Sequence, residues 1–311
     1  MNWLLPLILG CSMACSMACH AGAADQPASP TLAPEQASGG GFDGARAWAH
    51  LRAQVEIGPR VAGTPANART REYIIATLAA SGIKAVEQPF EAQTPVGTVQ
   101  MANVIATLPG DRPDRIILAS HFDTKLFKEF RFVGASDSAS STAAVLELAR
   151  VLKDRPRPFT LEFLFFDGEE AFVEWTATDS TYGSRHYVQH ARTSGTLQGI
   201  KALILLDMIG DKNLNLRREE NSTRFLTDII WRTARRLGHQ RHFLNESTPV
   251  EDDHLPFLQA GVPAVDIIDL DYPAWHTADD TLDNVSAESV KIVGDVVLAA
   301  LPAIEQRLLK P

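Results

Sequence analysis

The sequence predicts an α/β protein whose single domain is built on a central twisted β-sheet, mixed but largely parallel, and flanked by helices. Three observations support this prediction. The chain has 311 residues, of which 45% are hydrophobic and 22% charged, which is an ordinary globular composition with enough length to bury a sizeable core. Helical and strand patterns alternate after Phe42, and no second linker divides them. Strand candidates such as 161–166 and 202–206 are nearly continuous apolar runs, which is typical of strands buried on both faces.

Residues 1–24 have the pattern of a secretory signal peptide. An apolar run at 3–9 is followed by small residues, including Ala21-Gly22-Ala23, a pattern typical of signal-peptide cleavage sites. The run is too short to span a bilayer, and no later stretch approaches the roughly 20 apolar residues that spanning requires. Gly10-Cys11 also resembles a bacterial lipoprotein cleavage site, which would place a lipid anchor on Cys11. We therefore expect an exported protein without a transmembrane segment, either secreted or periplasmic, or anchored as a lipoprotein.

A flexible linker is predicted over 25–41, where Pro, Ala, Ser and Gly dominate the composition. The folded catalytic domain would then occupy 42–311. All three cysteines of the chain precede this linker, at Cys11, Cys15 and Cys19. The folded part therefore cannot depend on disulfides or on thiolate chemistry.

Within 42–311 the periodicity of apolar residues predicts each element in turn. Apolar residues at spacings of three and four predict helices at 43–57, 65–81, 138–153, 183–192, 222–238 and 286–307. Alternating or continuous apolar runs predict strands at 84–91, 100–108, 115–120, 160–166, 201–207 and 262–268. A turn containing Pro95 and Gly97 separates the first two strands, which we expect to pair antiparallel at one end of the sheet.

The charge of the chain restricts its partners. The formal net charge is −9, and the isoelectric point is near 5.5. Nucleic acids and acidic membrane surfaces would repel such a protein, so neither is expected as its main partner. The sequence shows no heptad repeat or apolar face that would require a second copy, so we expect a monomer.

Acidic and histidine side chains follow four of the predicted strands at the point where each strand ends. They are His121 and Asp123, then Asp167, Glu169 and Glu170, then Asp207, and finally Asp269, Asp271 and His276. Another acidic residue, Asp137, lies in a loop that enters the third predicted helix. Open α/β sheets bind ligands at this edge, and carboxylates with imidazole and no sulfur suit a catalytic zinc site.

Each of these residues taken alone has a simpler explanation. Asp137 could cap its helix, a lone histidine could be a solvated loop residue, and the pair Glu169-Glu170 could be a charged turn. Their placement at the ends of consecutive strands favours a metal site instead.

The sequence around these side chains resembles that of a known family. The matching motifs are His121-Phe122-Asp123, Gly134-Ala135-Ser136-Asp137-Ser138, Phe166-Asp167-Gly168-Glu169-Glu170-Ala171, Leu206-Asp207-Met208-Ile209-Gly210 and Trp275-His276-Thr277. They resemble the M28-type zinc aminopeptidase superfamily and, within it, the glutaminyl cyclases of the animal type. Further features of the cyclase branch are Lys125, Phe132-Val133-Gly134-Ala135, Trp175 and Asp252-Asp253-His254-Leu255-Pro256-Phe257-Leu258. The resemblance extends from about Trp48 to the C-terminal helix and implies a zinc-aminopeptidase-like fold.

Carried over by position, the resemblance implies one zinc ion per chain. The residues that it implies as metal ligands are Asp137, Glu170 and His276. It also implies that Glu169 is the general acid and base, with Asp207 and Asp252 as its hydrogen-bonding partners. The residues at positions that shape the substrate pocket of the family are Trp175, Trp275, Tyr272 and Glu251.

Two positions depart from the family pattern. Glu251 stands where many members have glutamine, and Asp266 stands where many have histidine. Asp266 lies within an apolar strand, so its carboxyl group needs either a hydrogen-bonding partner or a raised pKa.

The resemblance implies a glutaminyl-peptide cyclotransferase, an acyltransferase that converts the N-terminal glutamine of peptides or proteins to pyroglutamate and releases ammonia. The alternative is a secreted M28-type aminopeptidase with two zinc ions, in which His121 and Asp207 would bind the second ion. A binding ectodomain on the same fold that has lost its metal is a further alternative. That alternative predicts damaged ligand positions, whereas the ligand residues are all intact in this sequence.

Overall fold

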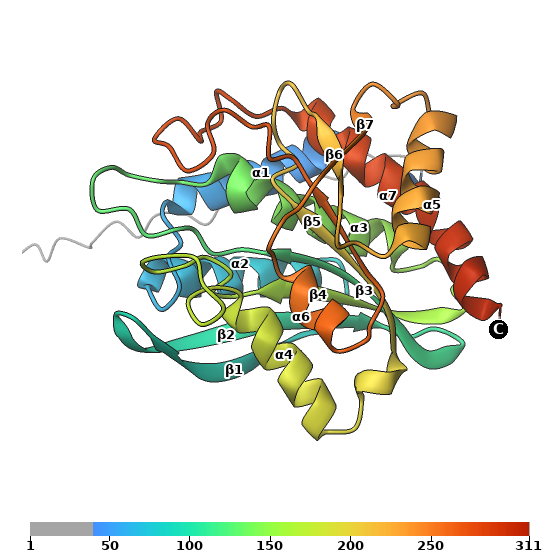
Figure 1. The fold of residues 1–311 in the computed structure, drawn as a ribbon, viewed down its shortest axis with the longest axis horizontal. Helices are drawn as coiled ribbons and strands as arrows, with labels where there is room; N and C mark the ends of the chain where they lie inside the picture. The colour runs from blue at the N-terminus through green and yellow to red at the C-terminus, as the bar shows by residue number, and fades with distance from the viewer. Residues whose placement is uncertain (1–39, 311) are drawn as a thin grey trace, which may run out of the picture. The chain divides into compact units, whose positions relative to one another are not determined.

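A six-stranded β-sheet forms the centre of the fold within residues 40–310, which are the residues that the computed structural model describes (Figure 1). In spatial order its strands are β1 (Ala85–Thr94), β2 (Gly97–Leu108), β4 (Phe159–Phe166), β3 (Arg112–His121), β5 (Ile200–Asp207) and β8 (Ala264–Ile268). The predicted signal peptide, Cys11 and most of the predicted linker lie outside the described residues.

The sheet is mixed, as predicted. Strand β3 pairs in parallel with β4 and β5, and β5 pairs in parallel with β8. Strands β1 and β2 form an antiparallel pair at one edge, which confirms the prediction for the first two strands. Strand β2 also pairs antiparallel with β4 and so joins this pair to the parallel part. The four parallel strands all end at one edge of the sheet.

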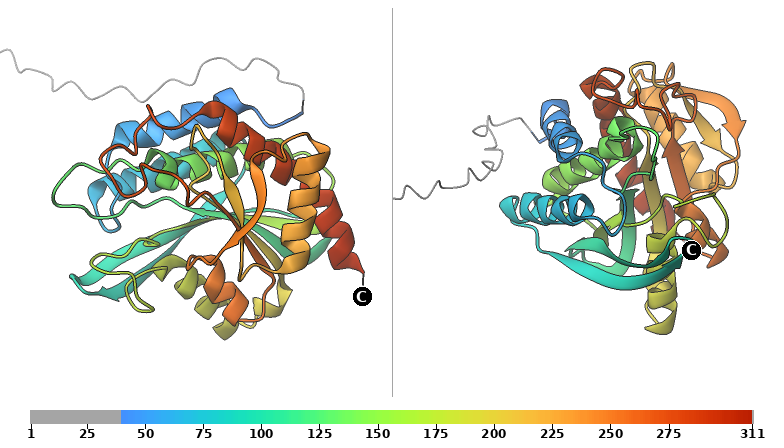
Figure 2. Two further views of the ribbon diagram at one scale, coloured as in Figure 1. Left: turned by 45° about the horizontal axis from the view of Figure 1, so that its top comes forward. Right: turned by 90° about the vertical axis from the view of Figure 1, so that its left-hand side faces the viewer.

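Helices cover both faces of the sheet (Figure 2). On one face lie α1 (Gly44–Ile57), α2 (Pro65–Ala80), α3 (Ser141–Leu152), α5 (Arg224–Arg236) and α7 (Ala287–Leu309). On the other face lie α4 (Tyr182–Thr193) and α6 (His254–Gln259). All six helices predicted from periodicity are present. None of the helices within residues 40–310 is long and apolar enough to cross a membrane.

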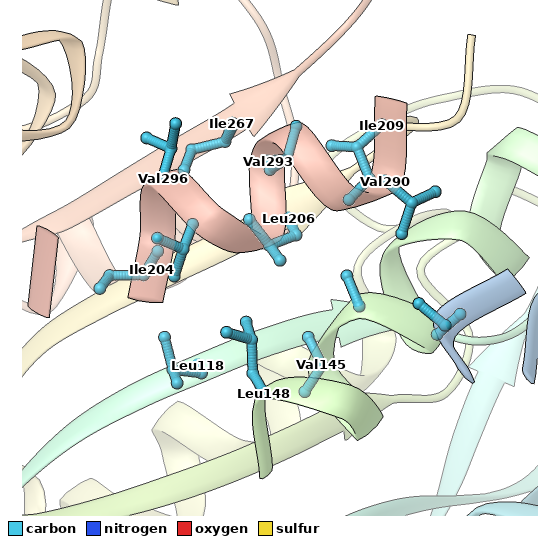
Figure 3. Packing of buried hydrophobic residues seen from close by; sticks show 14 of the residues in the cluster. Leu118, Val145, Leu148, Ile204, Leu206, Ile209, Ile267, Val290, Val293 and Val296 are labelled. Atoms are coloured by element: carbon cyan, nitrogen blue, oxygen red, sulfur yellow. The ribbon is translucent and has the colours of Figure 1, made fainter. Parts of the chain in front are cut away.

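The central strands separate two hydrophobic cores, because successive side chains of a strand point to opposite faces. In β3, Ile116 and Leu118 pack with the helices of the first face, whereas Ile117 and Ala119 pack with α4 and α6. Figure 3 shows the first core, where Leu118 of the sheet and Leu148 of α3 belong to one cluster. Burying one such aliphatic side chain fully stabilises the fold by roughly 1.5–3 kcal/mol. This double burial explains the nearly continuous apolar runs in the sequence.

The entry into the third helix differs from the prediction. Residues 135–140 form a wider π-type turn, and α3 begins at Ser141 instead of 138. Gly134 precedes this turn with a φ of 55°, and a Cβ there would lie 1.8 Å from the carbonyl oxygen of Asp137, so glycine is required. Asp137 therefore does not cap α3, and the simpler explanation of this residue as a helix cap is wrong.

Several short elements escape prediction from periodicity, three of which lie together in the chain. Strands β6 (Leu216–Glu219) and β7 (Phe243–Thr248) pair in parallel as a separate two-stranded sheet, and α6 follows them. Each has six residues or fewer. Runs this short carry too few apolar positions to reveal a period.

Candidate active site

A cavity of about 510 Å³ opens at the edge of the sheet where the parallel strands end. The predicted site residues that line it are Asp137, Glu169, Glu170, Trp175, Asp207, Glu251, Asp252, Trp275 and His276. Apolar side chains, including Met208, Ile268 and Leu270, complete the wall. The sheet therefore brings together residues that lie up to 139 positions apart (137 to 276) in the sequence.

Two carboxylates and one imidazole meet at one wall of the cavity. Nε2 of His276 lies 3.3 Å from Oδ2 of Asp137 and 3.2 Å from Oε1 of Glu170. One ligand atom from each of these side chains lies within 4.8 Å of the other two. Oε2 of Glu170 is buried without a hydrogen-bond partner among the described residues, although Nζ of Lys125 lies 3.8 Å away. This donor set, facing a cavity, fits a catalytic zinc site with three protein ligands.

Two buried residues that no sequence motif marks hold the backbone around Asp137. The carboxylate of Asp280 accepts the backbone N–H groups of Ser136 at 2.8 Å and of Asp137 at 3.1 Å. The fully buried guanidinium of Arg60 donates to the carbonyl oxygen of Gly134 at 2.9 Å. Neither residue follows a predicted strand. The one signal for Asp280 is its position four residues after His276.

Tyr272 does not line the cavity, which departs from the expectation for this residue. Its side chain is buried, and its hydroxyl donates to Oδ1 of Asp280 at 2.8 Å. The same carboxylate accepts the backbone N–H groups of the loop that carries Asp137, so Tyr272 is a supporting residue of this loop.

The three candidate ligands have strongly shifted proton affinities. Burial alone would raise the pKa of Asp137, but hydrogen bonds with His121 and His276 hold it well below its ordinary value. Burial raises the pKa of Glu170, and the charge of Asp137 raises it further. Burial opposes protonation of His276, yet hydrogen bonds with the two carboxylates raise its pKa to about 10. A metal ion that binds His276 therefore has to displace a proton.

The position of Glu169 is set by the loop that follows β4. The carboxylate of Asp123 accepts the backbone N–H groups of Glu169 at 3.0 Å and of Glu170 at 3.3 Å. Burial raises the pKa of Glu169 well above its ordinary value; the charge of His121 opposes this shift, and that of Asp252 reinforces it. A carboxyl group with a raised pKa, beside a cavity, can both accept and donate a proton near neutral pH.

A second buried group shares one residue with the first. Nε2 of His121 lies 3.2 Å from Oδ1 of Asp137 and 3.1 Å from Oδ1 of Asp207. One ligand atom from each of these three side chains also lies within 4.8 Å of the other two. A hydrogen bond of this nitrogen with Asp207, and an ion-pair contact with Asp137, account for this arrangement, and a second metal ion between the same residues would account for it equally.

Aromatic side chains stand at the mouth of the cavity. Trp275 is 43% exposed, and its ring stacks on that of His276 with 4.5 Å between the centroids. Nε1 of Trp175 donates to Oε2 of Glu251 at 3.2 Å. The loop that carries Trp175 is held by the buried carboxylate of Asp179, which accepts the backbone N–H groups of Phe172, Val173 and Glu174. Asp179 is a further supporting residue that no sequence motif marks.

Comparisons with known proteins show which family the chain resembles. The model of peptidase family M28 matches residues 103–301. The glutaminyl-peptide cyclotransferase-like protein of Bos taurus is 36% identical, over 74% of this chain and 68% of that protein. The crystal structure of the Acidobacteriales bacterium glutaminyl cyclase is 40% identical with a TM-score of 0.82, covering 89% of this chain and 100% of that chain. A Zn-dependent exopeptidase from Parabacteroides distasonis is 25% identical with a TM-score of 0.76, covering 83% and 97%.

The family match covers more than half of the chain, and the sequence match to the cyclotransferase-like protein spans more than two thirds of both proteins. The chain therefore belongs to peptidase family M28 and, within it, to the glutaminyl-peptide cyclotransferases.

Proposed function

We propose that this protein is a zinc-dependent glutaminyl-peptide cyclotransferase that acts on peptides or proteins with an N-terminal glutamine. The observation that carries the proposal is that Glu169 and the cluster of Asp137, Glu170 and His276 share one cavity. Membership of the cyclotransferase family supplies the reaction, and this arrangement of side chains supports it.

The proposed zinc site consists of Asp137, Glu170 and His276, with one ion per chain. Bound there, zinc would supply Lewis acidity to the side-chain amide of the substrate glutamine. Residues around the ligands would hold the backbone of Asp137 and Glu170 in place when the ion binds. Asp280 and Arg60 fix the loop of Asp137, and Asp123 fixes the backbone of Glu170.

Cyclisation forms a bond between the α-amine nitrogen and the side-chain amide carbon of glutamine, and it breaks the bond from that carbon to the amide nitrogen. The nucleophile already belongs to the substrate, so the protein supplies orientation and proton transfer. Glu169 accepts a proton from the α-amine and returns it to the departing nitrogen, which leaves as ammonia. The apolar wall formed by residues such as Ile268 and Leu270 excludes water that would compete with the amine.

The exposed indole of Trp275 would hold the glutamine stem against the mouth of the cavity. We expect Trp275→Ala to raise KM for a glutamine peptide by about tenfold and to change kcat little, because an aromatic contact contributes on the order of 1 kcal/mol beyond the area that it buries. Steady-state kinetics with ammonia detection would measure both constants. An unchanged KM would show that this side chain does not contact the substrate.

The direct test of the proposed function is mass spectrometry of a glutamine-initiated peptide after incubation with the purified, zinc-loaded protein. Loss of one ammonia from an otherwise intact peptide is the expected result. Loss of the whole N-terminal residue would contradict the proposal and indicate a peptidase. A peptide with N-terminal asparagine, whose side chain is one methylene shorter, serves as a matched control that should not cyclise at a comparable rate.

An aminopeptidase with two zinc ions is the second candidate, and the cluster of His121, Asp137 and Asp207 favours it. The fold similarity to a Zn-dependent exopeptidase is consistent with it. The peptide products separate the two candidates. Metal analysis gives an independent answer, because the cyclase requires one ion at the first cluster and the peptidase requires a second ion at His121 and Asp207.

We also propose that the protein is exported, on the basis of the sequence pattern in residues 1–24. The same pattern supports two products, a soluble periplasmic or secreted protein and a lipoprotein anchored through Cys11. The intact mass of the mature protein from its native host distinguishes them. Cleavage after Ala23 or Ala24 leaves an unmodified chain, whereas cleavage before Cys11 adds the mass of the lipid.

A further inference from the structure

Four ionisable side chains form a buried cluster behind the cavity. They are Glu219 at the end of β6, Asp252 in the loop before α6, His254 at the start of α6 and Asp266 in the middle of β8. Glu219 and Asp252 are 3% exposed, and His254 and Asp266 are fully buried. Asp252 lines the cavity and connects this cluster to the proposed active site.

The carboxyl group of Asp266 lacks any ordinary donor. Neither of its oxygens accepts an N–H or O–H hydrogen bond from the residues that the structure describes, and the same is true of Oδ2 of Asp252. One carboxyl oxygen of Asp252 nevertheless lies within 4.8 Å of one of Asp266, with no donor between them among the described residues. Two carboxylates accept hydrogen bonds and cannot donate them, so such a contact is favourable only when one of the two carries a proton.

The contacts of each carboxyl group determine whether Asp252 or Asp266 carries the proton. Oδ1 of Asp252 accepts the backbone N–H of Asp253, and this side chain lines the cavity. Asp266 has neither advantage, because its side chain is fully buried and does not line the cavity. An ionised carboxylate there would be desolvated without compensation. The proton therefore belongs on Asp266.

The imidazole of His254 does not change this conclusion. Its Nε2 lies 3.2 Å from Oε2 of Glu219, and Glu219 also accepts the backbone N–H groups of Asn221, Ser222 and Val250. Burial would raise the pKa of Glu219, but the contact with His254 and these backbone donors lower it to about 2, so Glu219 is ionised. Nδ1 lies 3.8 Å from Oδ2 of Asp266, which is too far for a hydrogen bond. His254 therefore donates no hydrogen bond to Asp266.

We propose that Asp266 is a protonated carboxylic acid in the folded protein and acts as a positioning residue, whose hydroxyl donates to Asp252 and holds that carboxylate ionised and directed at the active site. Asp252 then has a donor on each oxygen. Its negative charge is one of the reasons why the proton affinity of Glu169 is high. The catalytic part of this inference rests on the proposed cyclase function, whereas the protonation state of Asp266 does not.

The charges that face Asp266 support a neutral side chain. Burial raises the pKa of Asp266 well above its ordinary value, and the carboxylates of Asp252, Asp207 and Glu219 raise it further. Asp252 belongs to the loop before α6, Asp207 to β5 and Glu219 to β6. His254 of α6 is the fourth ionisable group near Asp266. Three carboxylates and one imidazole therefore face Asp266, and this surplus of carboxylates favours a neutral side chain there.

Infrared difference spectroscopy tests the protonation state directly. The spectrum of the wild type minus that of Asp266→Asn, at neutral pH, should contain the carbonyl-stretch band of a protonated carboxylic acid. Asp179→Asn is the matched control, because Asp179 is a buried carboxylate that backbone N–H groups hold ionised, and its difference spectrum should show only carboxylate bands. Absence of the protonated band in the Asp266 spectrum would overturn the proposal, whatever reaction the enzyme catalyses.

Stability measurements give a second readout that needs no substrate. The pKa of Asp266 is raised in the folded state above its unfolded value of about 4, so the folded protein binds the proton more tightly. The stabilisation from this proton is complete below pH 4 and is lost as the pH rises towards the folded pKa, by up to tenfold in the folding equilibrium constant per pH unit. The stability of the wild type relative to Asp266→Asn should therefore fall between pH 5 and 8. A rise over that range would show that Asp266 is ionised and paired with His254.

Two substitutions test the positioning role. In Asp266→Asn the side-chain amide can still donate to Asp252, so kcat should stay within about threefold of wild type. In Asp266→Leu that donor is lost, and kcat should fall about 10- to 100-fold with KM and zinc content unchanged, since hydrogen bonds to charged groups are strong. The acidic limb of the pH–rate profile should move to higher pH in the leucine variant alone, because Asp252 loses a bond that favours its ionised form.

Equal damage in both variants, or a profile that does not move, would contradict the positioning role and indicate a purely structural residue. A metal ion that is present in the wild type in addition to those at the cavity, and is lost in Asp266→Asn, would instead assign Asp252, His254 and Asp266 as ligands and overturn the proposal.

Discussion

Glu169→Gln is expected to lower kcat for cyclisation of a glutamine peptide by about 10²- to 10⁴-fold, the range that general acid–base groups contribute. Glutamine has nearly the shape of glutamate and keeps the backbone contacts to Asp123, but it cannot take a proton from the α-amine. The candidate metal ligands are unchanged, so zinc content and the melting temperature should stay at the wild-type values. Ammonia release and metal analysis on the same preparation measure both effects.

Glu162→Gln is the matched control for this variant. Glu162 lies on β4, the same strand that leads to Glu169, and it is also buried. It contacts Tyr187 and Arg115 and does not line the cavity. The control variant should retain the wild-type kcat. A wild-type rate in Glu169→Gln would exclude Glu169 as the acid and base and transfer that role to Asp207 or Asp252.

The second large effect is expected for His276→Ala. Removal of one of three ligands should weaken zinc binding by at least about 100-fold, because loss of a residue that merely orients a ligand already costs 10- to 100-fold. The two remaining ligands, Asp137 and Glu170, are both carboxylates, and their mutual repulsion would no longer be offset by the imidazole. Competition with a chromogenic chelator measures the affinity, and activity should be lost in parallel.

His190→Ala is the control for this loss of metal. His190 is exposed on α4 and belongs to neither candidate metal cluster, so the variant should bind zinc with the wild-type affinity. If His276→Ala fails to fold, Glu170→Gln tests the same site, because it removes one ligand charge with little change of shape. Wild-type zinc affinity in both variants would show that the metal binds elsewhere.

The parts of this structure that follow from short-range pattern are the ones that could be predicted from the sequence. Continuous apolar runs such as 161–166 require a strand covered on both faces, and spacings of three and four require helices. The carboxyl ends of parallel strands meet at one edge, so the polar residues that follow β4, β5 and β8 had to converge there. Glu169, Asp207 and His276 do line one cavity. The role of each residue came from the resemblance and not from the pattern.

Other features depend on contacts between residues far apart in the sequence, for which periodicity carries no information. Asp280 holds the backbone of Asp137 across 143 positions, and Arg60 holds Gly134 across 74. Tyr272 donates to Asp280 and does not line the cavity, although the family resemblance implies a place in the pocket.

The sequence by itself determined the α/β class, the antiparallel first pair of strands and the edge at which the polar residues meet, because these follow from side-chain periods of two and 3.6 residues. Only the tertiary structure decided which buried side chains share a proton. In the sequence, Asp266 is a lone acidic residue within an apolar strand. In the folded protein, Glu219 of β6 and Asp252 of the loop before α6 lie near it. The proton affinity of a buried carboxyl group depends on the distances to such neighbours, and those distances exist only once the chain has folded.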